Sequence, residues 1–153
     1  IGTGIGFGVY KDGKLLVAEG GHQLIQRHSD DHFISACPFH SNCMEGLASG
    51  SAMEKRWNKR GVEIEDKKAW ELEAYYLAQG ITNICMMYFP EVIILGGGVM
   101  HHEGLVEMVR EEVKKNINGY IAAPQIVLPG LGDNAGVVGA IELGRRYQRI
   151  VEM

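Results

Sequence analysis

The sequence predicts an α/β domain in which strands pack against helices. Short apolar stretches alternate along the chain with longer stretches of helical periodicity, which is typical of that fold class. Glycine-rich turns follow two of the predicted strands, at residues 96–98 and 130–132. A loop rich in cysteine and histidine, at residues 22–43 and called the metal loop below, adds a predicted zinc-binding loop to this fold.

The first third of the chain is expected to form a hairpin, the metal loop and a helix. In residues 1–10, glycine alternates with larger side chains, which is the period of a strand. An Asp-Gly turn follows, and residues 15–17 return as the second strand. The metal loop is polar and irregular, and a first helix is expected over residues 44–57.

The remaining elements alternate between helix and strand. Asp66 is a suitable N-cap for a long helix that ends before Pro90. Residues 91–95 are continuously apolar after Glu91, which predicts a buried strand in a parallel position. The elements that follow are a helix at 104–116, a strand at 125–128 and a last helix from about 133 to 148.

Composition narrows the class of protein. A chain of 153 residues that is 46% hydrophobic can bury the core of one ordinary domain. The formal net charge of −4 and the scattered basic residues predict no nucleic-acid partner, and no apolar run is long enough for a membrane span. We expect no signal peptide, reduced cysteines and a cytoplasmic location.

Four residues have the types and the spacing of a zinc site. Cys37, His40 and Cys43 follow one another with two residues between each, and His22 lies fifteen residues before Cys37. Thiolate and imidazole are ligands that zinc prefers, and four of them leave no open position, so the zinc would be structural. The alternatives are buried free cysteines or a disulfide, but an odd cysteine count does not suit a disulfide framework. Cys85 lies in an apolar run and is expected to be an ordinary core residue.

Three glycine-rich turns could contact a bound nucleotide. Residues 2–8 match neither a P-loop nor a dinucleotide-binding motif. Their bare backbone could approach phosphate oxygens, with the Thr3 hydroxyl as a further donor, or could receive a tightly packed neighbour. Residues 96–100 and 130–136 follow two strands, and each could be an ordinary turn. Two such turns on adjacent strands favour a shared crevice for a ligand.

Other polar residues have no partner at the spacing of a functional site. Charged residues within 103–115 are expected to form a solvated helix face. Four histidines are likewise expected to be solvated surface residues. They are His28, His32, His101 and His102.

Five motifs occur in an order that resembles the ROK family of sugar kinases and repressors. They are GTGIG at 2–6, EGGH at 19–22, CPFHSNCMEGLASG at 37–50, ILGGGV at 94–99 and GDNAG at 132–136. The CPxHxxC form followed by EGLASG is most similar to the bacterial fructokinase branch, whereas ROK glucokinases usually show CxCG there. The resemblance covers nearly the whole chain.

The resemblance implies an actin-like, ribonuclease-H-like ATPase fold, with this chain as the carboxyl-terminal lobe of a two-lobe kinase. It implies ATP-dependent phosphorylation of a hexose, with D-fructose giving fructose 6-phosphate as the expected reaction, and Mg²⁺ bound together with ATP. The expected partners are ATP, the hexose, the amino-terminal lobe and a second copy in a homodimer.

The resemblance also assigns roles to individual residues. Glu19, His22 and Glu45 would bind sugar hydroxyls, and His22 would also be a zinc ligand. The residues expected to contact ATP are Gly2, Thr3, Gly4, Ser51, Gly96, Gly97, Gly98, Val99 and Met100.

This sequence lacks two motifs of the family's kinases. One is the Asp-x-Gly-Gly-Thr phosphate motif, and the other is the Asn-Asp pair whose aspartate deprotonates the sugar hydroxyl. No catalytic residue is therefore assigned, and the chain alone is expected to be inactive because it lacks the base. The alternatives are that the chain is the sugar-sensing domain of a ROK repressor, or that it is a non-catalytic fragment stabilised by zinc.

Overall fold

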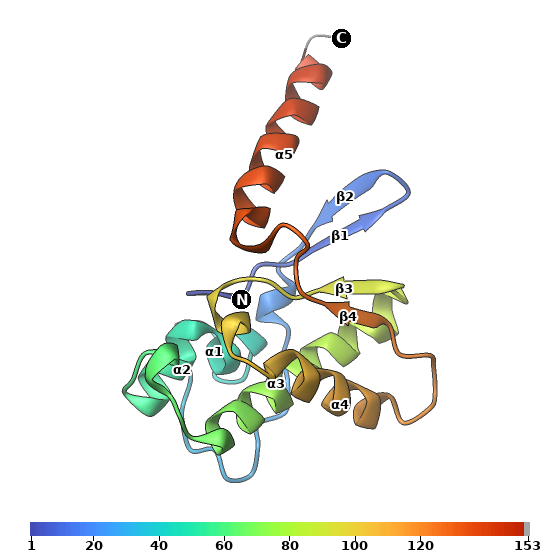
Figure 1. Cartoon of the computed structure of the whole chain (residues 1–153). Coiled ribbons are helices and arrows are strands. Elements are labelled where there is room, and N and C mark those ends of the chain that lie inside the picture. The colour runs from blue at the N-terminus through green and yellow to red at the C-terminus, as the bar shows by residue number, and fades with distance from the viewer. Residues whose placement is uncertain (152–153) are drawn as a thin grey trace.

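The computed structural model describes residues 1–151 of the chain, and side chains within residues 1–146. Its helices and strands are β1 (Gly8–Lys11), β2 (Lys14–Val17), α1 (Met44–Ala48), α2 (Gly50–Trp57), α3 (Lys67–Tyr88), β3 (Val92–Ile94), α4 (Leu105–Ile117), β4 (Gln125–Val127) and α5 (Ala135–Val151). Helices α1 to α4 form one layer, the strands lie on one side of it, and α5 extends away from this body (Figure 1). Among the described residues, no helix combines the length and the apolar character needed to cross a bilayer.

The strands form two separate pairs in the described part of the chain. β1 pairs antiparallel with β2, and β3 pairs parallel with β4, with Ile93 opposite Ile126. The predicted parallel arrangement of the strand near residue 93 is confirmed. Its predicted full burial is wrong, because side chains alternate across a strand: within β3 only Ile93 packs against the core, and the next residue to do so is Leu95. Val92 and Ile94 point away from the helices and are exposed.

The expected strand at residues 1–10 is wrong for its first seven residues. The backbone of this segment bonds to other parts of the chain instead of to a neighbouring strand. The carbonyl of Ile1 accepts from the N–H of Val99 at 3.2 Å, and the carbonyl of Gly2 accepts from the N–H of Gly50 at 2.7 Å. These bonds bring the start of the chain between α2 and the turn that follows β3.

The expected single helix over residues 44–57 is divided into α1 and α2. Ser49 has an extended backbone, with φ −80° and ψ 161°, and interrupts the helix. Its hydroxyl then accepts from the N–H of Ala52 at 3.2 Å and caps α2. The Ser-Gly pair at this point favours such a break, because serine bonds to nearby backbone groups and glycine destabilises a helix interior.

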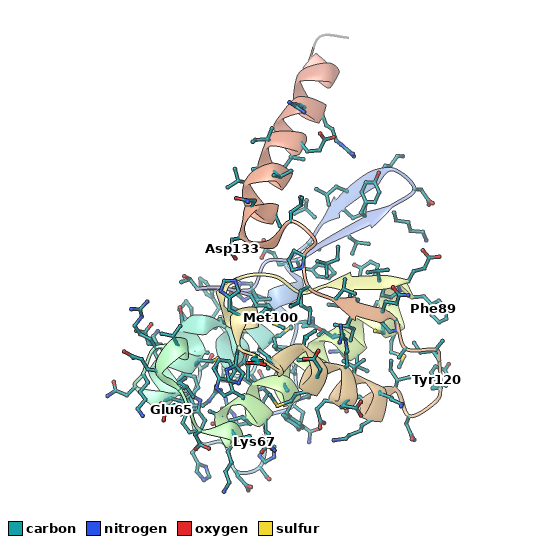
Figure 2. The ribbon with its side chains drawn as sticks, viewed as in Figure 1. Glu65, Lys67, Phe89, Met100, Tyr120 and Asp133 are labelled. Atoms are coloured by element: carbon teal, nitrogen blue, oxygen red, sulfur yellow. The ribbon has the colours of Figure 1, made fainter. Side chains whose placement is uncertain are left out.

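Helix α3 is the central element of the core. Its predicted N-cap is confirmed, since the Asp66 carboxylate accepts from the N–H of Lys68 at 3.0 Å. The helix packs against α1 and α4, and Cys85 is fully buried within it, as expected. The last residues of the helix, Met86 to Tyr88, are exposed, and Phe89 ends it in a left-handed conformation at the edge of the molecule (Figure 2).

A buried polar cluster ties the metal loop to α2 and α3. The carboxylate of Asp31 accepts from the hydroxyl of Tyr76 at 2.6 Å, from the Arg56 guanidinium at 3.2 Å and from the N–H of Phe33 at 3.0 Å. Burial alone would raise the pKa of Asp31. The hydrogen bonds from Tyr76 and Phe33 and the charge of Arg56 outweigh burial and hold this pKa below its ordinary value.

Candidate functional site

The four predicted zinc ligands meet at one point. The ligand atoms of His22, Cys37, His40 and Cys43 all lie within 4.8 Å of one another. Nδ1 of His22 lies 3.8 Å from the sulfur of each cysteine, and Nδ1 of His40 lies 3.7 Å from the sulfur of Cys37. In a tetrahedral zinc site with ordinary bond lengths, sulfur and nitrogen ligands are roughly 3.6 Å apart. The donor set and its spacing therefore fit a closed zinc site.

Local backbone structure brings the ligands together. His22 ends a short 3₁₀ helix at Gly20–His22, and Cys43 is the N-cap of α1. A β-bridge between Leu24 and Cys43 joins the two segments that carry them. A Cβ at Gly46 would lie 2.9 Å from the Cβ of Cys37, so glycine allows α1 to approach the middle of the metal loop closely.

The two thiols differ in their electrostatic surroundings. Burial raises the pKa of Cys43, and the N–H of Gly46 offsets only part of that effect. Burial also raises the pKa of Cys37, but backbone N–H groups at Phe39 and His40 and the neighbouring thiol of Cys43 bring it below the ordinary value. The surroundings therefore shift the pKa values of the two thiols in opposite directions, and zinc would require both thiols as thiolates.

The carboxylate of Glu45 lies between the metal ligands and the first glycine turn. Its Oε1 is 3.6 Å from Nε2 of His22, and its Oε2 accepts from the N–H of Ile5 at 2.7 Å. Nδ1 of His22 faces the cysteines, so Nε2 is the nitrogen that faces the carboxylate. At 3.6 Å the contact is electrostatic and too long for a hydrogen bond, but it places the carboxylate where a partner of a metal-binding histidine commonly lies. The side chains of His22 and Glu45 are 29% and 27% exposed, which leaves both accessible to a ligand.

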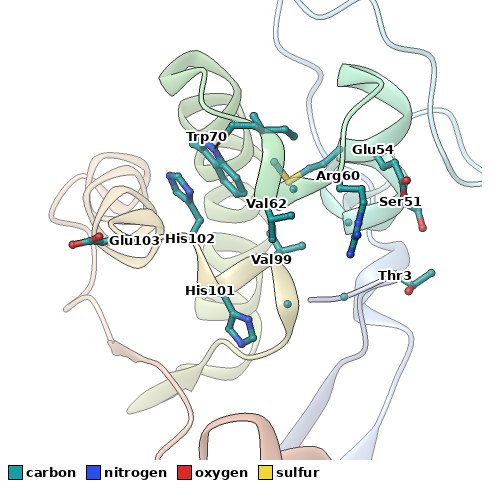
Figure 3. Close-up of a pocket in the computed structure, with 16 residues that line it drawn as sticks. Thr3, Ser51, Glu54, Arg60, Val62, Trp70, Val99, His101, His102 and Glu103 are labelled. Atoms are coloured by element: carbon teal, nitrogen blue, oxygen red, sulfur yellow. Dashed lines mark hydrogen bonds between the residues drawn. The ribbon is translucent and has the colours of Figure 1, made fainter.

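A cavity of about 660 Å³ lies beside this site (Figure 3). Three segments that are far apart in the sequence line it together. Residues from these segments that were expected to contact ATP are Gly2, Thr3, Ser51, Gly98 and Val99. The first glycine turn, the start of α2 and the turn after β3 therefore share one cavity.

Other predicted site residues lie outside the lining of this cavity. Gly4 faces the Glu45 carboxylate, and Gly96 packs against a proline side chain. Gly97 has a φ of +98°, which favours glycine, and a Cβ there would lie 2.5 Å from a backbone carbonyl oxygen. Met100 is buried in the core, and Glu19 is exposed at the start of the short helix that ends at His22.

The cavity is also lined by residues that the sequence analysis did not assign to a site, among them Arg60 and Trp70. The rings of Trp70 and His102 stack 3.7 Å apart with an angle of 4° between their planes. The expectation that His102 is a solvated residue is therefore wrong, and burial lowers its pKa. Figure 3 shows this stacked pair on one side of the cavity and Arg60 near Ser51 on the other. This stacking joins α3 to the segment before α4. It could not be predicted from the spacing of residues in the sequence.

The fold and the site agree with one protein family. The chain matches the ROK family over residues 1–146 and belongs to it. It is 44% identical to a fructokinase of Zymomonas mobilis, over 94% of this chain and 52% of that protein. It is 41% identical to a putative fructokinase of Bacillus subtilis, over 95% of this chain and 53% of that protein. The chain thus spans about half the length of the curated relatives it matches.

Solved structures confirm the predicted actin-like α/β fold. A ROK hexokinase from Thermus thermophilus has a TM-score of 0.77 and 29% identity, over 92% of this chain and 53% of that chain. A ROK glucokinase from Streptomyces griseus, in complex with glucose and AMPPNP, has a TM-score of 0.75 and 24% identity, over 95% of this chain and 59% of that chain.

Proposed function

We propose that this chain is the nucleotide-binding and sugar-binding lobe of an ATP-dependent hexose kinase, with D-fructose as substrate and fructose 6-phosphate as product. The observation that carries the proposal is the position of Glu45. One carboxylate oxygen lies beside the predicted metal ligand His22, and the other holds the segment that lines the neighbouring cavity. Fructokinases that are 36–44% identical to the chain support fructose as the sugar.

Phosphoryl transfer depends mainly on positioning and on neutralising the charge of the phosphates. In the cavity, the hydroxyls of Thr3 and Ser51 and the guanidinium of Arg60 are able to bind phosphate oxygens. Mg²⁺ bound with ATP would neutralise further charge. A bound zinc ion would have no open position and therefore a structural role, in which His22, Cys37, His40 and Cys43 would hold it and His22 and the start of α1 would be fixed in place.

The sugar would bind next to the metal centre. The carboxylate of Glu45 can accept a hydrogen bond from a sugar hydroxyl, and His22 presents its Nε2 at the same place. Glu19 is proposed as a third contact because it begins the helix that ends at His22. The base that deprotonates the sugar is assigned to an amino-terminal lobe, which we propose as the partner of this chain.

The proposal is tested by measuring fructose 6-phosphate formation by the complete protein with MgATP. Glu45→Gln should raise the KM for fructose about 10- to 100-fold, because a charge-assisted hydrogen bond is lost. The KM for MgATP should change little, since the glutamine oxygen can still accept from the N–H of Ile5. Glu65→Gln, at an exposed glutamate before α3, is the matched control.

Two results would contradict this assignment. A fructose KM that is unchanged in Glu45→Gln removes Glu45 from the sugar site. A complete protein that binds fructose without turning it over favours the sugar-sensing alternative.

A further inference from the structure

The first five residues lie between the metal centre and the cavity and are held from both sides. The carbonyl of Gly2, which lines the cavity, accepts from the N–H of Gly50 at 2.7 Å. Three residues later, the N–H of Ile5 donates to the Glu45 carboxylate at 2.7 Å. The position of this cavity wall is therefore set at one end by α2 and at the other by Glu45.

Glu45 is linked to the predicted metal centre in two ways. Through its side chain it lies 3.6 Å from Nε2 of His22. Through its backbone it lies in α1, whose N-cap is the ligand Cys43. Its carbonyl also accepts from the N–H of Ser49, the N-cap of α2, whose first residue Gly50 lines the cavity. Glu45 thus contacts the predicted metal ligand His22, the first glycine turn and the break between α1 and α2.

We propose that Glu45 is a positioning residue that couples metal binding to nucleotide binding. A metal bound to His22 would fix its ring, the fixed ring and the Glu45 carboxylate would hold each other in place across their 3.6 Å contact, and the carboxylate would hold the backbone of Ile5 and with it the cavity wall. The identity of the second ligand as a nucleotide rests on the proposed function. Because such coupling is a free energy shared by two sites, the nucleotide must strengthen metal binding by the same factor.

The chain offers a matched pair of substitutions for this contact. A Cβ at Gly4 would lie 2.6 Å from Oε2 of Glu45, so Gly4→Ala displaces the carboxylate without altering a metal ligand. A Cβ at Gly6 would meet nothing within 4 Å. Neither glycine has a positive φ, so alanine suits the backbone at both. Gly6→Ala is therefore the control for Gly4→Ala.

The first experiment measures the affinity of the complete protein for AMPPNP with Mg²⁺ by calorimetry, with zinc bound and after chelation. Removing zinc should weaken AMPPNP binding about tenfold. Glu45→Ala and Gly4→Ala should weaken it similarly with zinc bound and should lose the dependence on zinc, whereas Gly6→Ala should behave as the unchanged protein. In the reverse direction, AMPPNP should tighten zinc binding, measured by competition with a coloured chelator.

The second experiment needs no nucleotide and measures hydrogen exchange at the amide of Ile5. Zinc removal should speed this exchange in the unchanged protein, while in Glu45→Ala it should be fast with or without zinc. Amides in α4 should stay protected throughout, which separates a local effect from unfolding.

The outcomes distinguish the coupling from the proposed function. Equal AMPPNP affinity with and without zinc, and Ile5 exchange that ignores zinc, overturn the coupling and leave the function standing. A zinc-loaded protein that does not bind AMPPNP overturns the function, and the Ile5 exchange then decides whether Glu45 transmits metal binding to the turn.

Discussion

Replacing Asp31 by alanine should weaken the attachment of the metal loop to α2 and α3. The side chains of Asp31 and Arg56 are 4% and 5% exposed, and their charged groups are 3.2 Å apart. Removing one partner of a buried ion pair commonly costs about 3–5 kcal/mol, because the other charge stays buried. The Arg56 guanidinium keeps its bond to the carbonyl of Leu47, but the hydroxyl of Tyr76 loses its acceptor. We therefore expect a loss near the lower end, about 3 kcal/mol.

The assay is urea unfolding followed by the fluorescence of the two tryptophans, with the free energy obtained by linear extrapolation. The control is Asp30→Ala, the neighbouring position, whose exposed carboxylate accepts from the hydroxyl of Ser29. It should change the free energy of unfolding by no more than about 0.5 kcal/mol. If Asp31→Ala and Asp30→Ala unfold at the same urea concentration, the reasoning about the buried cluster is refuted.

Four further outcomes are expected. Folding lowers the pKa of Asp31, so the stability that its carboxylate contributes is present above about pH 4 and is lost as the pH falls through the pKa of the folded state. The difference in free energy of unfolding between the unchanged protein and Asp31→Asn should therefore shrink in acid. A difference that does not change with pH would contradict this. Purified protein should hold about one zinc per chain by elemental analysis, and Cys43→Ser should hold much less; equal zinc in both would exclude the proposed site. Ser49→Ala removes the cap of α2 and should lower the free energy of unfolding by about 1 kcal/mol in the same urea assay. The carboxylate oxygens of Glu73 are buried without a hydrogen bond among the described residues, and burial raises the pKa of Glu73 well above its usual range. Glu73→Met should therefore raise the free energy of unfolding at pH 7 by about 1–3 kcal/mol. A loss of stability would show that the carboxyl group has a favourable partner.

The meeting of Cys37, His40 and Cys43 at one point was predictable because its information is local. Cys37, His40 and Cys43 lie within one short turn, and the ligand properties of thiol and imidazole belong to the residue types themselves. The N-cap at Asp66 was predictable for the same reason, since its carboxylate bonds to a backbone N–H two residues away. Interactions over so few residues depend little on the rest of the fold.

The cavity was only partly predictable because its walls come from distant segments. The stacking of His102 on Trp70 joins residues that each looked ordinary in sequence, a solvated histidine and a core tryptophan. The break at Ser49 depends on whether the following glycine finds a backbone partner elsewhere, and it bonds to Gly2. Such contacts cannot be read from periodicity, because periodicity reports one element at a time.

The sequence by itself determined which cysteines and histidines the metal loop offers as ligands and the order of most helices and strands. It also showed that the glycine-rich turns belong to one type of fold. Only the tertiary structure decided what each glycine does. Gly2 and Gly98 line the cavity, whereas Gly4 and Gly97 leave room for a carboxylate and for a backbone carbonyl. The physical reason is that glycine leaves free the space that a side chain would fill. The role of each glycine therefore depends on which group the folded chain brings into that space.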